Sequence, residues 1–94
     1  MAGSSTVRVR IEGRVQGVGY RLWTEGLAAE LALAGWVRNR RDGAVEALFC
    51  GNADSVAEML VRCRRGPPGA RVTAVRVVEE GGEPPTGFAV LPSH

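Results

Sequence analysis

Gly13-Arg14-Val15-Gln16-Gly17-Val18-Gly19-Tyr20-Arg21 is the most informative stretch of this chain. It joins an alternating segment, in which Val7, Val9 and Ile11 share one side, to a helical pattern that starts at Tyr20. Glycines adopt positive φ easily because they lack a Cβ, so the amides of such a loop can converge on an anion. The helix start adds free N–H groups, and Arg21 adds a planar cation. The stretch therefore predicts a phosphoryl-group site where a strand meets a helix.

In the rest of the chain, segments with the hydrophobic pattern of a strand, which repeats every two residues, alternate with segments that have the helical pattern of about 3.6 residues. We expect a strand over 6–12, a helix over 20–34 stopped by Gly35, and strands over 35–41 and 44–50 joined by the hairpin turn Asp42-Gly43. A second helix follows Gly51, with Asn52 or Asp54 as its cap, and ends before Gly66-Pro67-Pro68-Gly69. Its predicted apolar face consists of Val56, Met59, Leu60 and Cys63.

Two further strands complete the pattern. One covers 72–79, with Thr73, Val75 and Val77 expected on its inner face, and a short one covers 88–91. The order predicts an α+β fold, the ferredoxin-like split βαβ sandwich, as βαββαβ plus a short terminal strand. We expect a mostly antiparallel sheet with both helices on one face. Because the chain has only 94 residues, we expect a single domain over 1–94, with 1–5 flexible.

Composition restricts the function. All 12 basic residues are Arg, which excludes a Walker-type or Schiff-base lysine, and the net charge of +2 is too small to indicate nucleic acid. No apolar run approaches the ~20 residues that span a bilayer, and no signal peptide is visible, so we expect a cytoplasmic protein without a membrane partner.

The sequence offers little metal or redox chemistry. Cys50 and Cys63 lack metal-ligand spacing, and the sole histidine, His94, is the last residue. We therefore expect no metal site, no cofactor and no catalytic histidine.

Two familiar glycine loops can be ruled out. A Walker A loop ends in Gly-Lys-Ser/Thr, and this chain has no lysine. A dinucleotide fingerprint built on Gly17 and Gly19 would need a small residue at position 22, where Leu22 stands.

Two motifs instead resemble the signatures of the acylphosphatase family. The first is Ile11-Glu12-Gly13-Arg14-Val15-Gln16-Gly17-Val18-Gly19-Tyr20-Arg21. The second is Gly35-Trp36-Val37-Arg38-Asn39 followed, at the family's spacing, by Gly43, Val45 and Gly51. The resemblance runs from about Val7 to Leu91, and two signatures at the right separation are far more specific than one glycine loop.

The resemblance implies a small metal-free enzyme that hydrolyses acyl phosphates to a carboxylate and inorganic phosphate. It implies that Arg21 is the catalytic, phosphate-binding arginine and that Asn39 holds the attacking water. Asn39 has the strand parity of Val37, so its side chain is expected on the helix-covered side, toward the loop. The partners implied are a small acyl phosphate and the phosphate product, and we expect a monomer. The backbone amides expected to bind phosphate are those of Gln16, Gly17, Val18, Gly19 and Tyr20.

The sequence departs from the family pattern at two positions. Tyr20 stands where Phe is usual, so its hydroxyl needs a partner if it is buried. Ala32 replaces a glycine often found late in the first helix, and we expect it to favour continuation of that helix. Gln16 is expected to contribute its amide, with its side chain bonded within the loop.

Two alternative functions are open to a protein with this predicted fold. The fold also carries non-catalytic modules that bind RNA or a small anionic ligand, but the expected outer positions lack the aromatic platform that RNA recognition needs. A similar domain occurs in much longer maturation proteins that handle carbamoyl phosphate, whereas this chain ends at His94, which favours a free-standing enzyme. Arg38, Arg40 and Arg41 are interpreted as solvated charges of an edge strand, with steering of the substrate as the alternative. Trp23 and Trp36 are interpreted as packing residues. The expected outer positions are Arg8, Arg10, Glu12, Glu46, Leu48 and Arg76.

Overall fold

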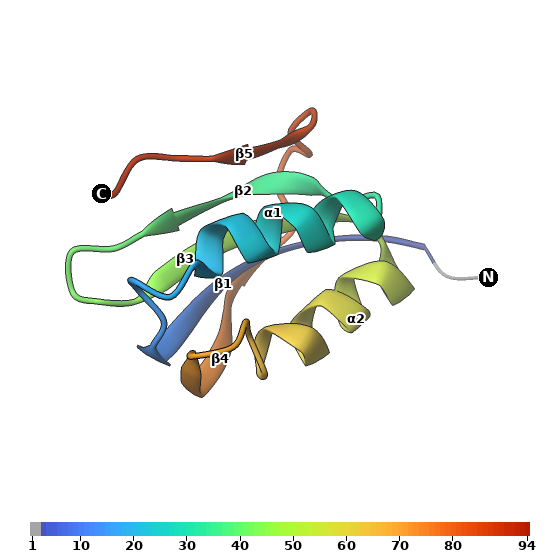
Figure 1. The fold of residues 1–94 in the computed structure, drawn as a ribbon. Coiled ribbons are helices and arrows are strands. Elements are labelled where there is room, and N and C mark those ends of the chain that lie inside the picture. The colour runs from blue at the N-terminus through green and yellow to red at the C-terminus, as the bar shows by residue number, and fades with distance from the viewer. Residues whose placement is uncertain (1–2) are drawn as a thin grey trace.

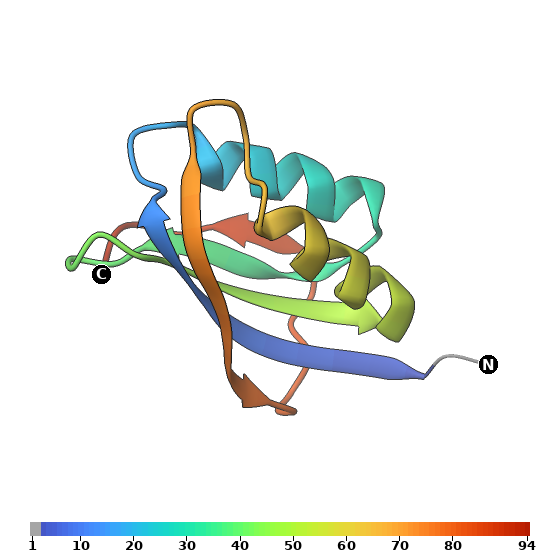
Figure 2. The ribbon, with the colours of Figure 1, turned by 90° about the horizontal axis from the view of Figure 1, so that it is seen from below.

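The computed structural model describes residues 3–94 and consists of one mixed sheet with two helices (Figure 1). The sheet order is β4-β1-β3-β2-β5, and every pair is antiparallel except β2 with β5. Both helices cover the same face, so the predicted α+β ferredoxin-like fold is confirmed (Figures 1 and 2). The elements are β1 Ser4–Arg14, α1 Tyr20–Glu30, β2 Ala34–Asn39, β3 Val45–Asn52, α2 Ala53–Cys63, β4 Arg71–Glu80 and β5 Phe88–Val90.

The core lies between the helices and the covered face of the sheet. Alternation along β1 buries Val7, Val9 and Ile11, as expected from the period-two pattern. Phe49 of β3 and Met59 of α2 are fully buried against them. The predicted apolar face of α2 is confirmed, and the side chain of Asn52 caps this helix by accepting a hydrogen bond from the amide of Asp54.

The inner face of β4 differs from the prediction. Its pairing with β1 shifts between Arg8 and Val9 and again between Glu12 and Gly13, as β-bulges do. The second shift leaves Thr73 exposed and unpaired in the register, while Val72 and Val75 pack against the core. Each bulge interrupts the alternation of side chains along the strand. The prediction assumes an unbroken repeat of two residues and therefore places Thr73 on the inner face, which is wrong.

The first helix also ends earlier than expected. It stops at Glu30, because Ala32 adopts a left-handed conformation with φ of 55°. The amide of Ala32 donates to the carbonyl of Ala29, and the amide of Leu33 donates to that of Ala28, as in a Schellman motif. This turn buries Leu33 and starts β2, so the prediction that Ala32 favours continuation of the helix is wrong.

The face of the sheet that the helices leave uncovered, here called the open face, carries a network of ion pairs. Arg8, Arg38 and Arg40 bind Glu46, and Arg10 and Arg76 bind Glu12. Arg38 and Arg40 are therefore not the solvated charges of an edge strand, since β2 lies between β3 and β5. Trp36 pairs with Leu48 in the register and lies under the guanidinium of Arg38, 4.8 Å from the ring centroid, so this face does carry one aromatic residue.

The first and last segments that the structure describes are both held by the sheet. Ser4 and Ser5, which we expected to be flexible, pair with Asn52 and Gly51 in β1, while positions 1–2 lie outside the described residues. The amide of His94 donates to the carbonyl of Asn39. Both views place the β1–α1 loop, the β2–β3 turn and the C-terminus at one end of the molecule (Figures 1 and 2). No helix in the described part is long and apolar enough to cross a membrane.

Candidate active site

The β1–α1 loop folds around two left-handed glycines. Gly17 has a φ of 75° and Gly19 a φ of 79°, and a Cβ at either position would meet no atom within 4 Å. Glycine is thus required for the backbone conformation and not for lack of space, because L side chains strain this region. Val15 is fully buried and Val18 packs against the core, so these two side chains anchor the loop.

The amides of this loop are free. No side chain caps the N-terminus of α1, whose N-cap residue is Gly19. The amides of residues 16–20 donate to no backbone or side-chain acceptor within 3–94. Unpaired N–H groups at a helix start attract anions, and the helix dipole adds to this attraction.

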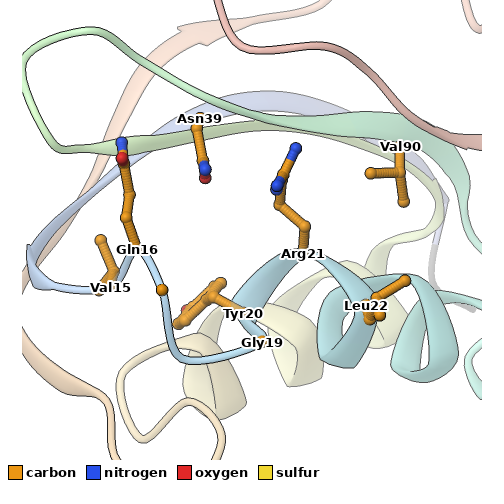
Figure 3. Close-up of a pocket in the computed structure, with 9 residues that line it drawn as sticks. Val15, Gln16, Gly19, Tyr20, Arg21, Leu22, Asn39 and Val90 are labelled. Atoms are coloured by element: carbon orange, nitrogen blue, oxygen red, sulfur yellow. The ribbon is translucent and has the colours of Figure 1, made fainter.

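A pocket of about 320 Å³ opens in front of the loop (Figure 3). Among the described residues, no carboxylate, thiol or imidazole lines it, and Arg21 is its charged lining residue. Throughout residues 3–94, no three His, Cys, Asp or Glu side chains come together as metal ligands. The pocket thus suits an anion better than a cation. Its lining consists of Val15, Gln16, Gly17, Gly19, Tyr20, Arg21, Leu22, Asn39 and Val90.

Arg21 and Asn39 enter this pocket from opposite sides (Figure 3). Arg21 lies in the first turn of α1, and Asn39 is the last residue of β2. The strand parity of Asn39 places its side chain on the helix side, as expected. Within the described residues neither side chain makes a hydrogen bond or ion pair with another group.

The side chain of Gln16 has a different role from the one we expected. Its amide nitrogen donates to the carbonyls of Arg40 at 2.7 Å and Ala44 at 2.8 Å. It therefore ties the loop to the β2–β3 turn and does not bond within the loop. Sequence reasoning could not find these partners, because both acceptors are backbone carbonyls more than twenty residues away.

Tyr20 finds the partner that its buried hydroxyl needs. The hydroxyl donates to the carbonyl of Cys63 at 2.7 Å, and the ring leaves no space for a Cβ at Gly66. Burial raises the pKa of Tyr20 far above its ordinary value, so the phenol stays neutral. Burial likewise raises the pKa of the Cys63 thiol to about 12, which makes it unreactive. Tyr20 thus fixes the start of α1 on α2.

Three apolar residues of the pocket were not singled out as site residues from the sequence. Val15 lies on the Gln16 side of the pocket, while Leu22 and Val90 lie beyond Arg21, away from Gln16 (Figure 3). Leu22 is 69% exposed, and its position outside the apolar stripe of the expected helix is the sequence signal that it offers. Val90 gives no such signal, since it enters the site through the parallel pairing of β5 with β2.

Comparisons with known proteins agree with this picture. The sequence model of the Acylphosphatase family matches residues 7–90. An acylphosphatase of Nitrobacter hamburgensis is 65% identical over 68 residues, which cover 72% of this chain and 69% of the relative. One of Rhodospirillum rubrum is 54% identical over 88 residues, which cover 94% of this chain and 97% of the relative. The structure of an acylphosphatase from Coxiella burnetii has a TM-score of 0.88 and 37% identity, covering 94% of this chain and 93% of that one.

The fold and the pocket define a small α+β protein with an arginine-lined pocket at the junction of a strand and a helix. The sequence matches make this class specific. The chain belongs to the acylphosphatase family, and its assignment as an acylphosphatase enzyme is confirmed.

Proposed function

We propose that this chain hydrolyses small acyl phosphates by in-line attack of a water molecule that Asn39 orients. The amides of residues 16–20 and the guanidinium of Arg21 hold the phosphoryl group. One observation carries the proposal: unpaired amides, an unpaired guanidinium and an unpaired carboxamide converge on one pocket. The product leaves as a carboxylate and inorganic phosphate. The monomeric state, the cytoplasmic location and the exclusion of nucleic-acid and membrane partners stay predictions.

The chemistry asks for positioning and positive charge. In phosphoryl transfer, charge spreads over three equatorial oxygens, so the protein acts mainly by orienting the reactants and stabilising that charge. Fixed amides and one guanidinium suit this task because they do not need to reorganise during the reaction. Arg21 suits phosphate geometry, since its planar fork can donate two hydrogen bonds at once.

Asn39 supplies a neutral group for the water. A carboxamide accepts one hydrogen bond and donates another, so it can fix the direction of a water lone pair. A strong general acid is not needed, because the leaving group is a carboxylate of low basicity. The alternative, covalent catalysis, would need a nucleophilic serine or cysteine paired with a histidine. In the part of the chain that the structure describes, no serine, cysteine or histidine lines the pocket.

The apolar lining favours a neutral acyl group. In-line attack places the leaving group opposite the water. Leu22 and Val90 lie on the other side of Arg21 from Gln16 and offer an apolar surface without a second cation (Figure 3). An aromatic acyl phosphate is therefore a suitable probe.

The decisive experiment compares two variants on such a probe. Arg21→Ala should lower kcat/KM by about 10²–10³-fold or more and weaken inhibition by inorganic phosphate, because it removes a donor to the phosphoryl oxygens. Asn39→Ala should lower kcat by about 10²-fold through loss of water positioning, while phosphate inhibition stays unchanged.

A matched control removes the same charge elsewhere. Arg64 is exposed, follows α2 and lies outside the pocket lining, so Arg64→Ala should leave both kcat and phosphate inhibition unchanged. Normal turnover by Arg21→Ala would contradict the proposal, as would loss of phosphate inhibition in Asn39→Ala.

A further inference from the structure

The position of Asn39 depends on groups other than its own side chain. Asn39 ends β2 and pairs with Val45 at the start of β3, next to the turn. Its neighbours Arg38 and Arg40 project to the open face, since successive side chains of a strand alternate. Whatever holds these two arginines therefore also holds the backbone of Asn39.

A single carboxylate holds both of them. Glu46 lies on β3 opposite Arg38 and is only 7% exposed, although it belongs to the open face. Its Oε1 accepts hydrogen bonds from Arg38 Nε at 2.7 Å and Arg40 Nη1 at 3.3 Å, and its Oε2 accepts one from Arg8 Nη1 at 2.7 Å. Burial acts to raise the pKa of Glu46, but the hydrogen bonds from Arg38 and Arg8 outweigh it, and the pKa stays below its ordinary value. The carboxylate is thus ionised and bound from β1 and from both sides of Asn39.

The same backbone is held from the opposite face of the sheet. Gln16 of the β1–α1 loop, called the phosphate loop below after its proposed role, donates to the carbonyl of Arg40, whose own amide donates to the carbonyl of Ala44. Arg40 is therefore held by Glu46 through its side chain and by Gln16 through its main chain. These contacts connect the open face to the loop through the residue next to Asn39.

We propose that Glu46 is a positioning residue for hydrolysis: by holding Arg38 and Arg40 on the open face, it fixes Asn39 relative to the phosphate loop. The inference rests on the proposed role of Asn39 as the group that orients the water. Displacement of a positioned group by about 1 Å can lower a rate by about 10²-fold, so a contact outside the pocket is enough to control turnover. Glu46 lies outside the pocket lining and acts through Asn39.

The open face offers a matched control. Glu12 likewise accepts hydrogen bonds from arginines, from Arg10 at 2.9 Å and Arg76 at 3.1 Å, but neither of these two flanks Asn39. Glu46→Gln and Glu12→Gln therefore change the charge equally and each break a carboxylate–arginine cluster. They differ in whether that cluster includes the neighbours of Asn39.

We expect Glu46→Gln to lower kcat for an aromatic acyl phosphate by about tenfold to a hundredfold. Inhibition by inorganic phosphate should stay unchanged, because the loop amides and Arg21 remain in place. Glu12→Gln should change neither quantity. A role in stability alone would lower the melting temperature of Glu46→Gln while leaving the kcat of the folded enzyme intact, and this result would overturn the proposal.

A double variant that combines Glu46→Gln with Asn39→Ala tests whether Glu46 affects kcat through Asn39. If Glu46 acts through Asn39, Glu46→Gln should cause no further loss of kcat in the Asn39→Ala background, at high enzyme concentration with spontaneous hydrolysis subtracted. An equal loss in both backgrounds would overturn the inference and leave the proposed function standing. Full activity of Asn39→Ala by itself would overturn the proposed mechanism instead.

A second variant guards against failure of Glu46→Gln to fold. Arg38→Gln breaks the 2.7 Å contact with Glu46 Oε1 from the strand that carries Asn39. Arg76→Gln breaks the comparable contact with Glu12 on the same face. We expect the first to lower kcat with unchanged phosphate inhibition and the second to have no effect, and equal kcat values in the two would contradict the proposal.

Discussion

The two ends of α1 use the same unusual backbone conformation for opposite purposes. At the N-terminal end, Gly19 has a φ of 79°, and the loop amides before the helix donate to no acceptor within residues 3–94. At the C-terminal end, Ala32 has a φ of 55°, and the amides of Ala32 and Leu33 donate to the carbonyls of the last turn. One left-handed residue leaves polar groups free, and the other satisfies them.

The difference teaches how to separate a structural turn from a binding turn. Helix-end amides without a protein acceptor bind water or a ligand, so converging donors that line a pocket mark a place where an anion could be held. The C-terminal turn is complete without a ligand and ends by burying Leu33. The N-terminal turn leaves its amides directed to the pocket, where the proposed phosphoryl group would accept hydrogen bonds from them.

The largest effect should follow from placing a negatively charged side chain in the pocket at the N-terminal end of α1. Asn39→Asp places a carboxylate of nearly equal shape opposite Arg21. We expect kcat/KM to fall by about 10³-fold or more, because the variant loses the neutral water-orienting group and repels the phosphoryl group. Unlike Asn39→Ala, it should also weaken inhibition by inorganic phosphate. Steady-state kinetics with phosphate as competitor measures both.

Asn52→Asp is the control for this substitution. Asn52 caps α2 with its side-chain oxygen, a role that Asp also fills well. It should keep normal kinetics and stability. Retained phosphate inhibition in Asn39→Asp would contradict the idea that the N-terminal end of α1 is the anion site.

An intermediate effect is expected from Gly19→Ala. A Cβ there meets no atom, but a left-handed alanine costs about 1–2 kcal/mol, and relaxation of that strain would turn the amides away from their common point. We expect kcat/KM to fall by about tenfold or more, measured together with thermal unfolding. Gly81→Ala, with a φ of 88° in an exposed loop and equally open space, should show the stability loss with normal kinetics. Equal activity of the two variants would remove the distinction between the turns.

The smallest effect should come from the other end of the helix. Ala32→Gly relieves the left-handed strain, and the greater freedom of glycine in the unfolded chain offsets part of the gain. We expect a net stabilisation of up to about 1 kcal/mol, or roughly 4–8 °C in Tm, without a change in kinetics. Differential scanning calorimetry measures it, and a destabilised variant would show that Ala32 is not strained.

Much of the fold could be predicted from periodicity and turn residues. The strands, the hairpin at Asp42-Gly43 and the buried face of α2 follow from local patterns, which is why they agree with the structure. The prediction places Thr73 on the wrong face of β4 because a register shift in the pairing with β1 interrupts the alternation. It misses the early end of α1 because Ala32 adopts a left-handed conformation that its helix propensity does not predict.

Some features of the candidate site could likewise be predicted from the sequence, and others could not. The glycines and Arg21 could be selected from the loop and the helix start, whereas Asn39 could be selected only through the resemblance to the second family signature. The partners of the Gln16 side chain, the place of Val90 in the lining and the shared carboxylate of Glu46 could not. These depend on pairings between residues that are far apart in the chain.

By itself, the sequence determined the element order, the glycine loop with its following arginine, and the family to which the chain belongs. These features are local, because each is set by the conformational freedom or the periodic exposure of neighbouring residues. Only the tertiary structure decided which donors stay unpaired, which arginines are neutralised on the open face and which residues meet across the pocket. The physical reason is that pairing is a property of distance in space, and sheet register brings together groups that the chain order keeps apart.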